Sequence, residues 1–428
     1  MPVLIICASP ALCQFAQAFR HLFSKPQYEY LETVLLALMQ VEGRRTLSEM
    51  QRAVAERLSV AGLSRFFAVS PWLEEEVAQH WQQRFHLQMQ ASVQQEHHRL
   101  RMRRPRRVGR PSATLVTGYL ILDDSTHHKP KGKKMGGLGR HHSTTYDKRV
   151  SGHSLFQGLY VLLGRRCPLT PRMYRSKQVC QAGGHPFHSK VDLSVSCVEE
   201  FVPVEETHTH VLVDAWYMNK RLWKAAKQRG FDLSGGIANN RYLRVQAADG
   251  TRSWQSLAAW AVGLAPEAFE EVTWPSEAGG QKRYVHCVRT RIRKLGACQV
   301  LCVKDDPTDP PKKTRFFVCS LLQASAQQIV EHLAVRWDVE TFFGDFKELF
   351  GSDHYQLMSE RAIVRFWTLG CLAYVFVEEQ RAQRDPSQTI GQTRRAIRSD
   401  NYNNLLDWIV EHSHNGGTLE QIRSRLAA

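Results

Sequence analysis

The stretch "LVTGYLILDD", residues 115–124, has the pattern of a β-strand that ends in two aspartates. Before residue 115 the apolar residues recur at helical spacing, and from this residue on the period changes to that of strands. Adjacent side chains on a strand face opposite sides, so only one of Asp123 and Asp124 should contribute to a given site. The stretch therefore predicts a strand that delivers one carboxylate at its end.

The segments that follow predict the rest of a sheet. A later strand, "THVLVDAWY", ends near Asp214, which makes it a second strand with a carboxylate at its end. Three strands, a helix, a strand, a helix and a strand give the order of an α/β, ribonuclease H-like fold, with a mixed sheet and flanking helices. The predicted elements are strands at 115–124, 154–164 and 167–175, a helix at 188–202, a strand at 209–217, a helix at 219–230 and a strand at 231–240.

Composition changes along the chain predict its organisation. Short alternating runs such as "KRYVHCVRTRI" indicate a β-rich insertion, whose tryptophans 254, 260 and 274 are expected in a core or, alternatively, stacked on an unpaired base. The predicted units are an all-α N-terminal region at 1–98, a basic linker at 99–114, the first part of the core at 115–240, the insertion at 241–318, the second part of the core at 319–385 and a helical tail at 386–428.

Charge predicts a polyanionic partner. The chain has 57 Lys and Arg against 41 Asp and Glu, a net charge of +16, which favours nucleic acid. Seven arginines lie within "RLRMRRPRRVGR", residues 99–110, and we expect Arg103, Arg104, Arg106 and Arg107 to lie along phosphates, although a solvated charge run is the alternative. The short N-terminal helices fit either a helix-turn-helix unit, with Ser64 and Arg65 on its recognition helix, or a plain bundle.

The cysteines and the apolar runs of the sequence indicate the cellular compartment in which the protein is expected. The ten cysteines form no CxxC pair, so free thiols in a reducing cytosol are expected, with a zinc site at Cys180, His185 and His188 as a weaker alternative. The N-terminus lacks the basic region of a signal peptide, and no run reaches the length of a membrane span. We expect a cytoplasmic bacterial protein associated with the nucleoid.

One further segment, "VRWDVETFFGDFK" at 335–347, mixes charges with large aromatics. Its helix should begin near Ser325, because Ser325 and Gln328 form a capping box. At about 100° per residue, Arg336 and Lys347 share the face of Glu340, and Asp338 falls on the opposite face. Glu340 is therefore the acid expected to act with the two bases, and an Arg336–Glu340 surface ion pair is the plainer alternative.

Carboxylates at the ends of two adjacent strands and on a helix packed beside them would repel one another. Divalent cations between them would relieve this repulsion, and hard oxygen ligands suit Mg²⁺, or Mn²⁺ in its place. Two such ions activate a water or a 3′-hydroxyl and stabilise the leaving oxygen in phosphodiester hydrolysis and strand transfer.

This pattern resembles the DDE transposases of bacterial insertion sequences, and more narrowly the insertion-sequence-4-like group with its Y-(2)-R-(3)-E-(6)-K signature. Arg336, Glu340 and Lys347 match the signature spacing, and Leu333 stands where the signature has tyrosine. The resemblance covers roughly residues 115–384. Because the first aspartate of that group typically precedes threonine or serine, "LDDST" points to Asp124, and the resemblance implies Asp124, Asp214 and Glu340 as catalytic metal ligands.

The resemblance also implies an activity and partners. A transposase of this group cleaves double-stranded DNA at the element's terminal inverted repeats and joins the 3′ ends to target DNA, with a hairpin intermediate in some relatives and a homodimer in the synaptic complex. Arg336 and Lys347 would contact phosphates, and Lys129, Lys131, Lys133 and Lys134 form a mobile, glycine-rich basic loop beside the site. The rival readings are a structure-specific nuclease on the same fold and an inactive or domesticated DNA-binding protein.

Overall fold

The computed structural model describes residues 9–54, 59–102, 115–143, 145–246, 249–276 and 279–422. The predicted phosphate-contacting residues Arg103, Arg104, Arg106 and Arg107 lie outside these ranges.

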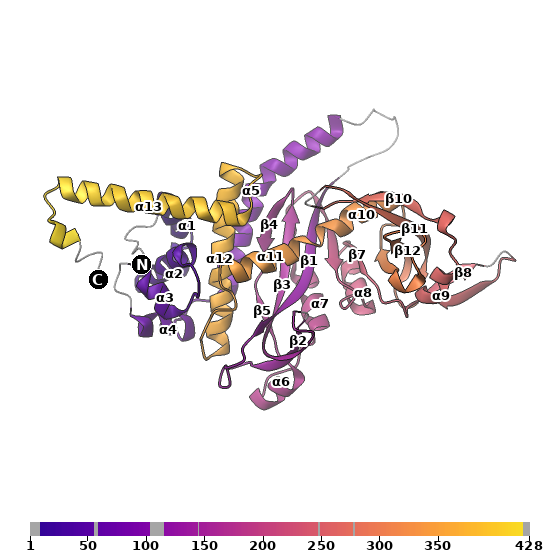
Figure 1. The fold of residues 1–428 in the computed structure, drawn as a ribbon, viewed down its shortest axis with the longest axis horizontal. Coiled ribbons are helices and arrows are strands. Elements are labelled where there is room, and N and C mark those ends of the chain that lie inside the picture. The colour runs from indigo at the N-terminus through magenta and orange to yellow at the C-terminus, as the bar shows by residue number, and fades with distance from the viewer. Residues whose placement is uncertain are drawn as a thin grey trace.

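A mixed sheet forms the centre of the molecule (Figure 1). Strand β1 (Val116–His128) pairs antiparallel with β3 (Lys148–Leu162) and parallel with β6 (Thr207–Val213), and β6 pairs parallel with β7 (Asp232–Gly236). The predicted mixed sheet is confirmed, and the strands that carry the first aspartates and Asp214 are neighbours. Three short strands also pair with β3: β2 (Gly139–Ser143), β4 (Arg165–Pro168) and β5 (Arg172–Tyr174).

The region predicted as a β-rich insertion extends this sheet. Strand β13 (Arg315–Cys319) pairs antiparallel with β7, and β12 (Gly296–Lys304) and β11 (Gln281–Ile292) continue outward from it. The core strands and the region at 241–318 therefore share one backbone hydrogen-bond ladder. The remaining elements there are β8 (Tyr242–Gln246), β9 (Arg252–Ser256), α9 (Leu257–Val262), η2 (Pro266–Ala268), β10 (Glu270–Trp274) and η3 (Pro311–Lys313).

Helices cover both faces of the sheet because its central strands are apolar on both sides. Leu120, Ile121 and Leu122 are all at most 1% exposed, so neither face of β1 meets solvent there. Asp123 lies toward Arg336 and Glu340, and Asp124 lies toward Lys190. The helices between the strands are α6 (Lys177–Gly183), α7 (Lys190–Glu200) and α8 (Lys220–Gln228).

The segment around Glu340 is two helices rather than one. Helix α10 (Ala326–Val335) begins at the predicted capping box of Ser325 and Gln328, and α11 (Asp338–Glu348) follows after a break at residues 336–337. Helix α12 (Glu360–Arg384), capped by Ser359, is buried along most of its length. It stands between the sheet and the N-terminal helices (Figure 1).

The N-terminal helices dock on α12 through a buried ion pair. Arg365 is fully buried, and its guanidinium donates to the Glu74 carboxylate at 3.1 Å and to the carbonyl oxygens of Phe66, Phe67 and Trp72. The helices of this group are α1 (Pro10–Gln17), η1 (Arg20–Leu22), α2 (Lys25–Gln40), α3 (Leu47–Arg52), α4 (Val60–Ala68), α5 (Glu74–Met102) and the C-terminal α13 (Ile390–His414).

Helix α5 continues through Met102, so the first residues of the predicted 99–114 linker are helical. Among the helices in the described ranges, none combines the length and the apolarity that crossing a bilayer requires.

Candidate active site

Asp123 and Asp124 lie within β1, which continues past the predicted end at residue 124 to His128, and the two aspartates have different surroundings. Their backbones pair with Gln157 and Phe156 of β3, and the alternation of a strand directs their side chains to opposite faces. Asp123 faces Arg336, whose Nη1 lies 3.9 Å from Asp123 Oδ2. The Asp214 carboxylate is also close enough to Arg336 and Glu340 to interact with them electrostatically. Asp123 and Asp214 are therefore the aspartates on the Glu340 side of the sheet.

Burial and neighbouring carboxylates raise the pKa of Asp123 to about 8. Burial is the largest cause, followed by the negative charges of Asp214 and Asp124 and, more weakly, Glu340. A carboxyl with such a pKa marks a place where negative charge is crowded and where a cation would be stabilised.

Asp214 follows the last residue of β6 and caps the turn after it. Its Oδ1 accepts hydrogen bonds from the backbone N–H of Trp216 at 2.9 Å and of Tyr217 at 3.1 Å. Burial raises the pKa of Asp214, although these two bonds and Arg336 act in the opposite direction. The turn thus fixes one oxygen of the carboxylate, and its other oxygen has no hydrogen bond within the described ranges.

Glu340 lies in the first turn of α11 and forms an ion pair with Arg336 across the helix break. Arg336 Nη2 lies 2.6 Å from Glu340 Oε1, so the ion pair expected from their four-residue spacing is present. Burial raises the pKa of Glu340 despite this partner. Its second oxygen, Oε2, is buried without a hydrogen-bond partner, which is costly for a carboxylate oxygen.

The side chains of this site have the oxygen ligands that a hard divalent cation prefers, but they are not arranged to bind one in this structure. All three carboxylates offer oxygen ligands, and the unpaired Glu340 Oε2 points to a missing partner. Within the described ranges, however, no group of three or more His, Cys, Asp or Glu side chains is arranged to hold a metal ion. The Arg336 guanidinium lies between Asp123 and Glu340, so it supplies the positive charge there.

Comparison with known families decides the class of this site. Residues 193–376 match the family model described as "Transposase DDE domain", a stretch that contains Asp214, Arg336, Glu340 and Lys347. This stretch is a transposase DDE domain. The chain is therefore a metal-dependent DNA transposase, an enzyme of DNA transposition and mobile elements, and domains of this family use divalent metal ions. The match covers less than half of the chain and begins after Asp123 and Asp124. No curated protein matches the chain significantly.

In the transposase, Asp124 lies within a hydrogen-bonded network on the other face of β1. Its carboxylate pairs with Lys190 Nζ at 2.5 Å and accepts hydrogen bonds from Ser154 Oγ at 3.1 Å and from Tyr217 Oη at 2.6 Å. Tyr217 is 1% exposed and belongs to the turn that Asp214 caps. Asp124 therefore holds the turn that carries Asp214.

The two other signature positions of the transposase, 347 and 333, lie in different environments. Lys347, at the end of α11, is largely buried, and burial lowers its pKa while the nearby Asp353 raises it. Leu333, in place of the signature tyrosine, is 4% exposed and packs in an apolar cluster with Val330, Leu301 and Val285. Position 333 thus serves the packing of α10 against the sheet.

The basic residues that were predicted to bind DNA lie in different parts of the structure. Lys131, Lys133 and Lys134 are exposed on the loop after β1, whereas the ammonium of Lys129 donates to the carbonyl oxygens of Asp353 and Tyr355 at 2.5 and 2.7 Å. Ser64 and Arg65 are exposed on α4, which belongs to the N-terminal helices and not to the sheet that carries the carboxylates.

Three partners of Asp124 had not been singled out from the sequence: Ser154, Lys190 and Tyr217. The position of Tyr217, three residues after Asp214, was the available signal, because a residue so placed lies on the same tight turn. Lys190 and Ser154 gave no local signal, since they come from a helix start and a strand that only the fold brings to Asp124.

Proposed function

We propose that this transposase cleaves DNA at the ends of its element and joins the 3′ ends to target DNA by two-metal hydrolysis and strand transfer. The proposal includes a ribonuclease H-like core of the insertion-sequence-4-like group. The observation that carries it is the convergence of Asp123 from β1, Asp214 from the turn after β6 and Glu340 from α11 on Arg336. The strand order β3-β1-β6-β7, with β3 antiparallel, supports the fold assignment.

We propose Asp123, in place of Asp124, as the first metal ligand beside Asp214 and Glu340. Asp123 is the β1 carboxylate that lies near Arg336 and Glu340, whereas both oxygens of Asp124 accept hydrogen bonds from its own partners. When bound, Mg²⁺, or Mn²⁺ in its place, supplies an activated water or 3′-hydroxyl and neutralises charge on the leaving oxygen.

Asp124 has a positioning role in this scheme. Its hydrogen bond from Tyr217 holds the turn whose N–H groups orient the Asp214 carboxylate, and Lys190 balances its charge. Partners of this kind orient metal ligands and commonly matter for metal affinity.

The role of Arg336 depends on the metal. A cation held by the three proposed carboxylate ligands would supply the positive charge that Arg336 supplies here, and the guanidinium would then be available to hold a phosphate of the cleaved strand in bidentate fashion. Lys347, two turns along α11, supplies a second positive charge on the same helix. The partners are the terminal inverted repeats and target DNA at the nucleoid, bound by two copies of the chain in a synaptic complex, with a hairpin intermediate as one route to second-strand cleavage.

Replacement of Glu340 tests the proposal. Glu340→Gln keeps the size of the side chain and removes a metal-binding charge, so Mg²⁺-dependent cleavage of an end-containing duplex should be abolished. Binding of the same duplex in Ca²⁺ should stay within about threefold of wild type, because the residue is not a phosphate contact.

The matched control is Asp338→Asn, since Asp338 lies on the same helix but pairs with Arg166. This variant should retain cleavage. Equal loss of binding and cleavage in Glu340→Gln would mean that Glu340 is structural, and cleavage without strand transfer by the wild type would favour a nuclease.

A further inference from the structure

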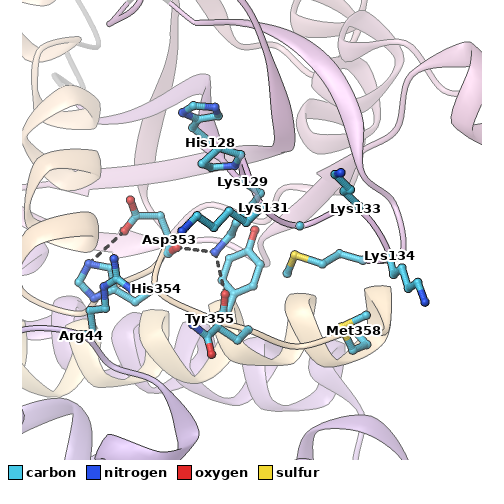
Figure 2. A pocket seen from close by; sticks show the side chains of 14 residues that line it. Arg44, His128, Lys129, Lys131, Lys133, Lys134, Asp353, His354, Tyr355 and Met358 are labelled. Carbon is cyan, nitrogen blue, oxygen red and sulfur yellow. Dashed lines mark hydrogen bonds and ion pairs between the residues drawn. The ribbon is translucent and has the colours of Figure 1, made fainter.

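A basic pocket lies at the C-terminal end of β1, beyond Asp123 and Asp124. Its walls are the loop after β1, the segment between α11 and α12, and the turn between α2 and α3, which contributes Arg44 (Figure 2). The cavity has a volume of about 790 Å³. Three parts of the chain that are distant in sequence therefore meet around one opening.

The pocket has a fixed frame. Lys129 joins the start of the loop to the opposite wall through the carbonyl oxygens of Asp353 and Tyr355, and its ammonium lies 3.6 Å from the centre of the Tyr355 ring. At the other end of the loop, Gly136 N–H donates to the carbonyl of Met358 at 2.7 Å. His153 links the two walls, since its ring bonds both the Tyr355 hydroxyl and the Gly136 carbonyl.

The charge of this pocket is unbalanced. Arg44, Lys131, Lys133 and Lys134 are exposed, and none of them has an ion-pair partner in the part of the chain that the structure describes. The single acid in the lining, Asp353, lies beside His354 and near Lys347. Cations held together without anions repel one another, so the pocket is suited to a polyanion.

The spacing between the pocket and the carboxylates can be estimated from the length of chain between Asp123 and Lys129. Lys129 lies six residues beyond Asp123, about 20 Å along an extended strand. Lys347 lies seven residues after Glu340, about 10 Å along α11, and is near Asp353 of the pocket. A duplex rises about 3.4 Å per base pair, so 20 Å corresponds to about six base pairs.

We propose that this pocket holds the DNA backbone about six base pairs from the phosphate that reacts, and so fixes the register of the DNA end against the carboxylates. The inference rests on the proposed cleavage of DNA ends. Arg44 comes from the N-terminal helices and the other cations come from the core, so both parts of the protein would contact the same stretch of the DNA backbone.

Binding as a function of duplex length tests the inference. The full chain is titrated in Ca²⁺ with labelled duplexes from the terminal inverted repeat that extend about three, six, nine or twelve base pairs beyond the cleavage position on either side. The test variant is Lys131→Gln/Lys133→Gln/Lys134→Gln, and the control is Lys25→Gln/Lys224→Gln/Lys227→Gln, three exposed lysines on α2 and α8.

The wild type and the control should gain affinity in one step between about three and nine base pairs on one side, and the test variant should lose that step. Its slope of log affinity against log salt should be smaller by about 2 to 3, or about 0.9 for each phosphate that the variant no longer neutralises. Equal affinities of the two variants at every length would overturn the inference, as would equal competition by inorganic phosphate at every length, which would indicate a site for free phosphate.

Failure of the inference is distinct from failure of the proposed function. Wild-type cleavage in Mg²⁺ is measured in parallel on the longest duplex, and it does not depend on whether the length step is present. Absent cleavage by the wild type would count against the proposed function alone.

Discussion

Asp123 and Asp124 are adjacent, yet they should respond differently to the same substitution. Asp123→Asn removes a proposed ligand, so Mn²⁺ binding measured by calorimetry and Mg²⁺-dependent cleavage should both fall, the rate by about a thousandfold. Asp124→Asn leaves Asp123 in place but replaces the charged acceptor of the Tyr217 hydrogen bond with a neutral amide, which weakens the hold on the Asp214 turn, so metal binding should weaken by only about 10- to 100-fold.

Tyr217→Phe is the matched control for the positioning role, because it removes that hydrogen bond and leaves every carboxylate in place. It should reproduce the effect of Asp124→Asn, and the two changes together should cost little more than either alone. Lost Mn²⁺ binding in Asp124→Asn with normal binding in Asp123→Asn would instead make Asp124 the ligand.

The choice between these two aspartates could not be made from the sequence. A strand with one wet face reveals by its alternation which residues point inward, but residues 120–122 are buried on both faces and carry no such pattern. The signature spacing of Arg336, Glu340 and Lys347 identified the helical segment, and the apolar runs before Asp123 and Asp214 identified two neighbouring strands. The direction of each side chain depended on which helix packed on which face.

At the scale of the elements, α12 joins the N-terminal helices to the sheet through Arg365. Arg365→Met leaves the Glu74 carboxylate without its close partner in a buried setting, and should lower the free energy of unfolding by about 3–5 kcal/mol. Urea titration followed by circular dichroism measures this loss.

Arg361→Met is the control from the same helix. Arg361 lies 3.8 Å from the same carboxylate but is 48% exposed, so its loss should cost less than about 1 kcal/mol. Similar losses in the two variants would contradict the assignment of the docking energy to the buried pair.

Element ends were predicted where local chemistry decides them. The capping box of Ser325 and Gln328 acts within three residues, and helix α10 begins there. The break at residues 336–337 was not predicted, and neither was the pairing of β13 with β7, which joins segments about 80 residues apart.

For the whole molecule, acid should destabilise the fold through its histidines. Burial lowers the pKa of each of a set of histidines in the described ranges, to about 4 for His141 and about 3 for His210. The other members are His80, His86, His127, His153, His332 and His354. In the unfolded chain these rings take up a proton near pH 6.5, so the unfolded state binds more protons below that value.

The stabilisation from neutral, buried histidines is therefore complete above about pH 6.5 and is lost as the pH falls toward 4. The raised pKa values of Asp123, Asp214 and Glu340 act in the opposite sense, but they involve fewer groups. The urea midpoint should fall between pH 6.5 and 4, and His210→Gln should reduce the slope. A flat profile over this range would contradict the expectation.

The unbroken ladder from β6 through β7 and β13 to β11 has a mechanical consequence. A flexible joint would need a boundary without backbone hydrogen bonds across it, but here β13 is bonded to β7 where the region at 241–318 meets the core strands. A displacement of β11 or β12 is transmitted through these bonds to β6, the strand that precedes Asp214, so the region at 241–318 should move with the core sheet as one body.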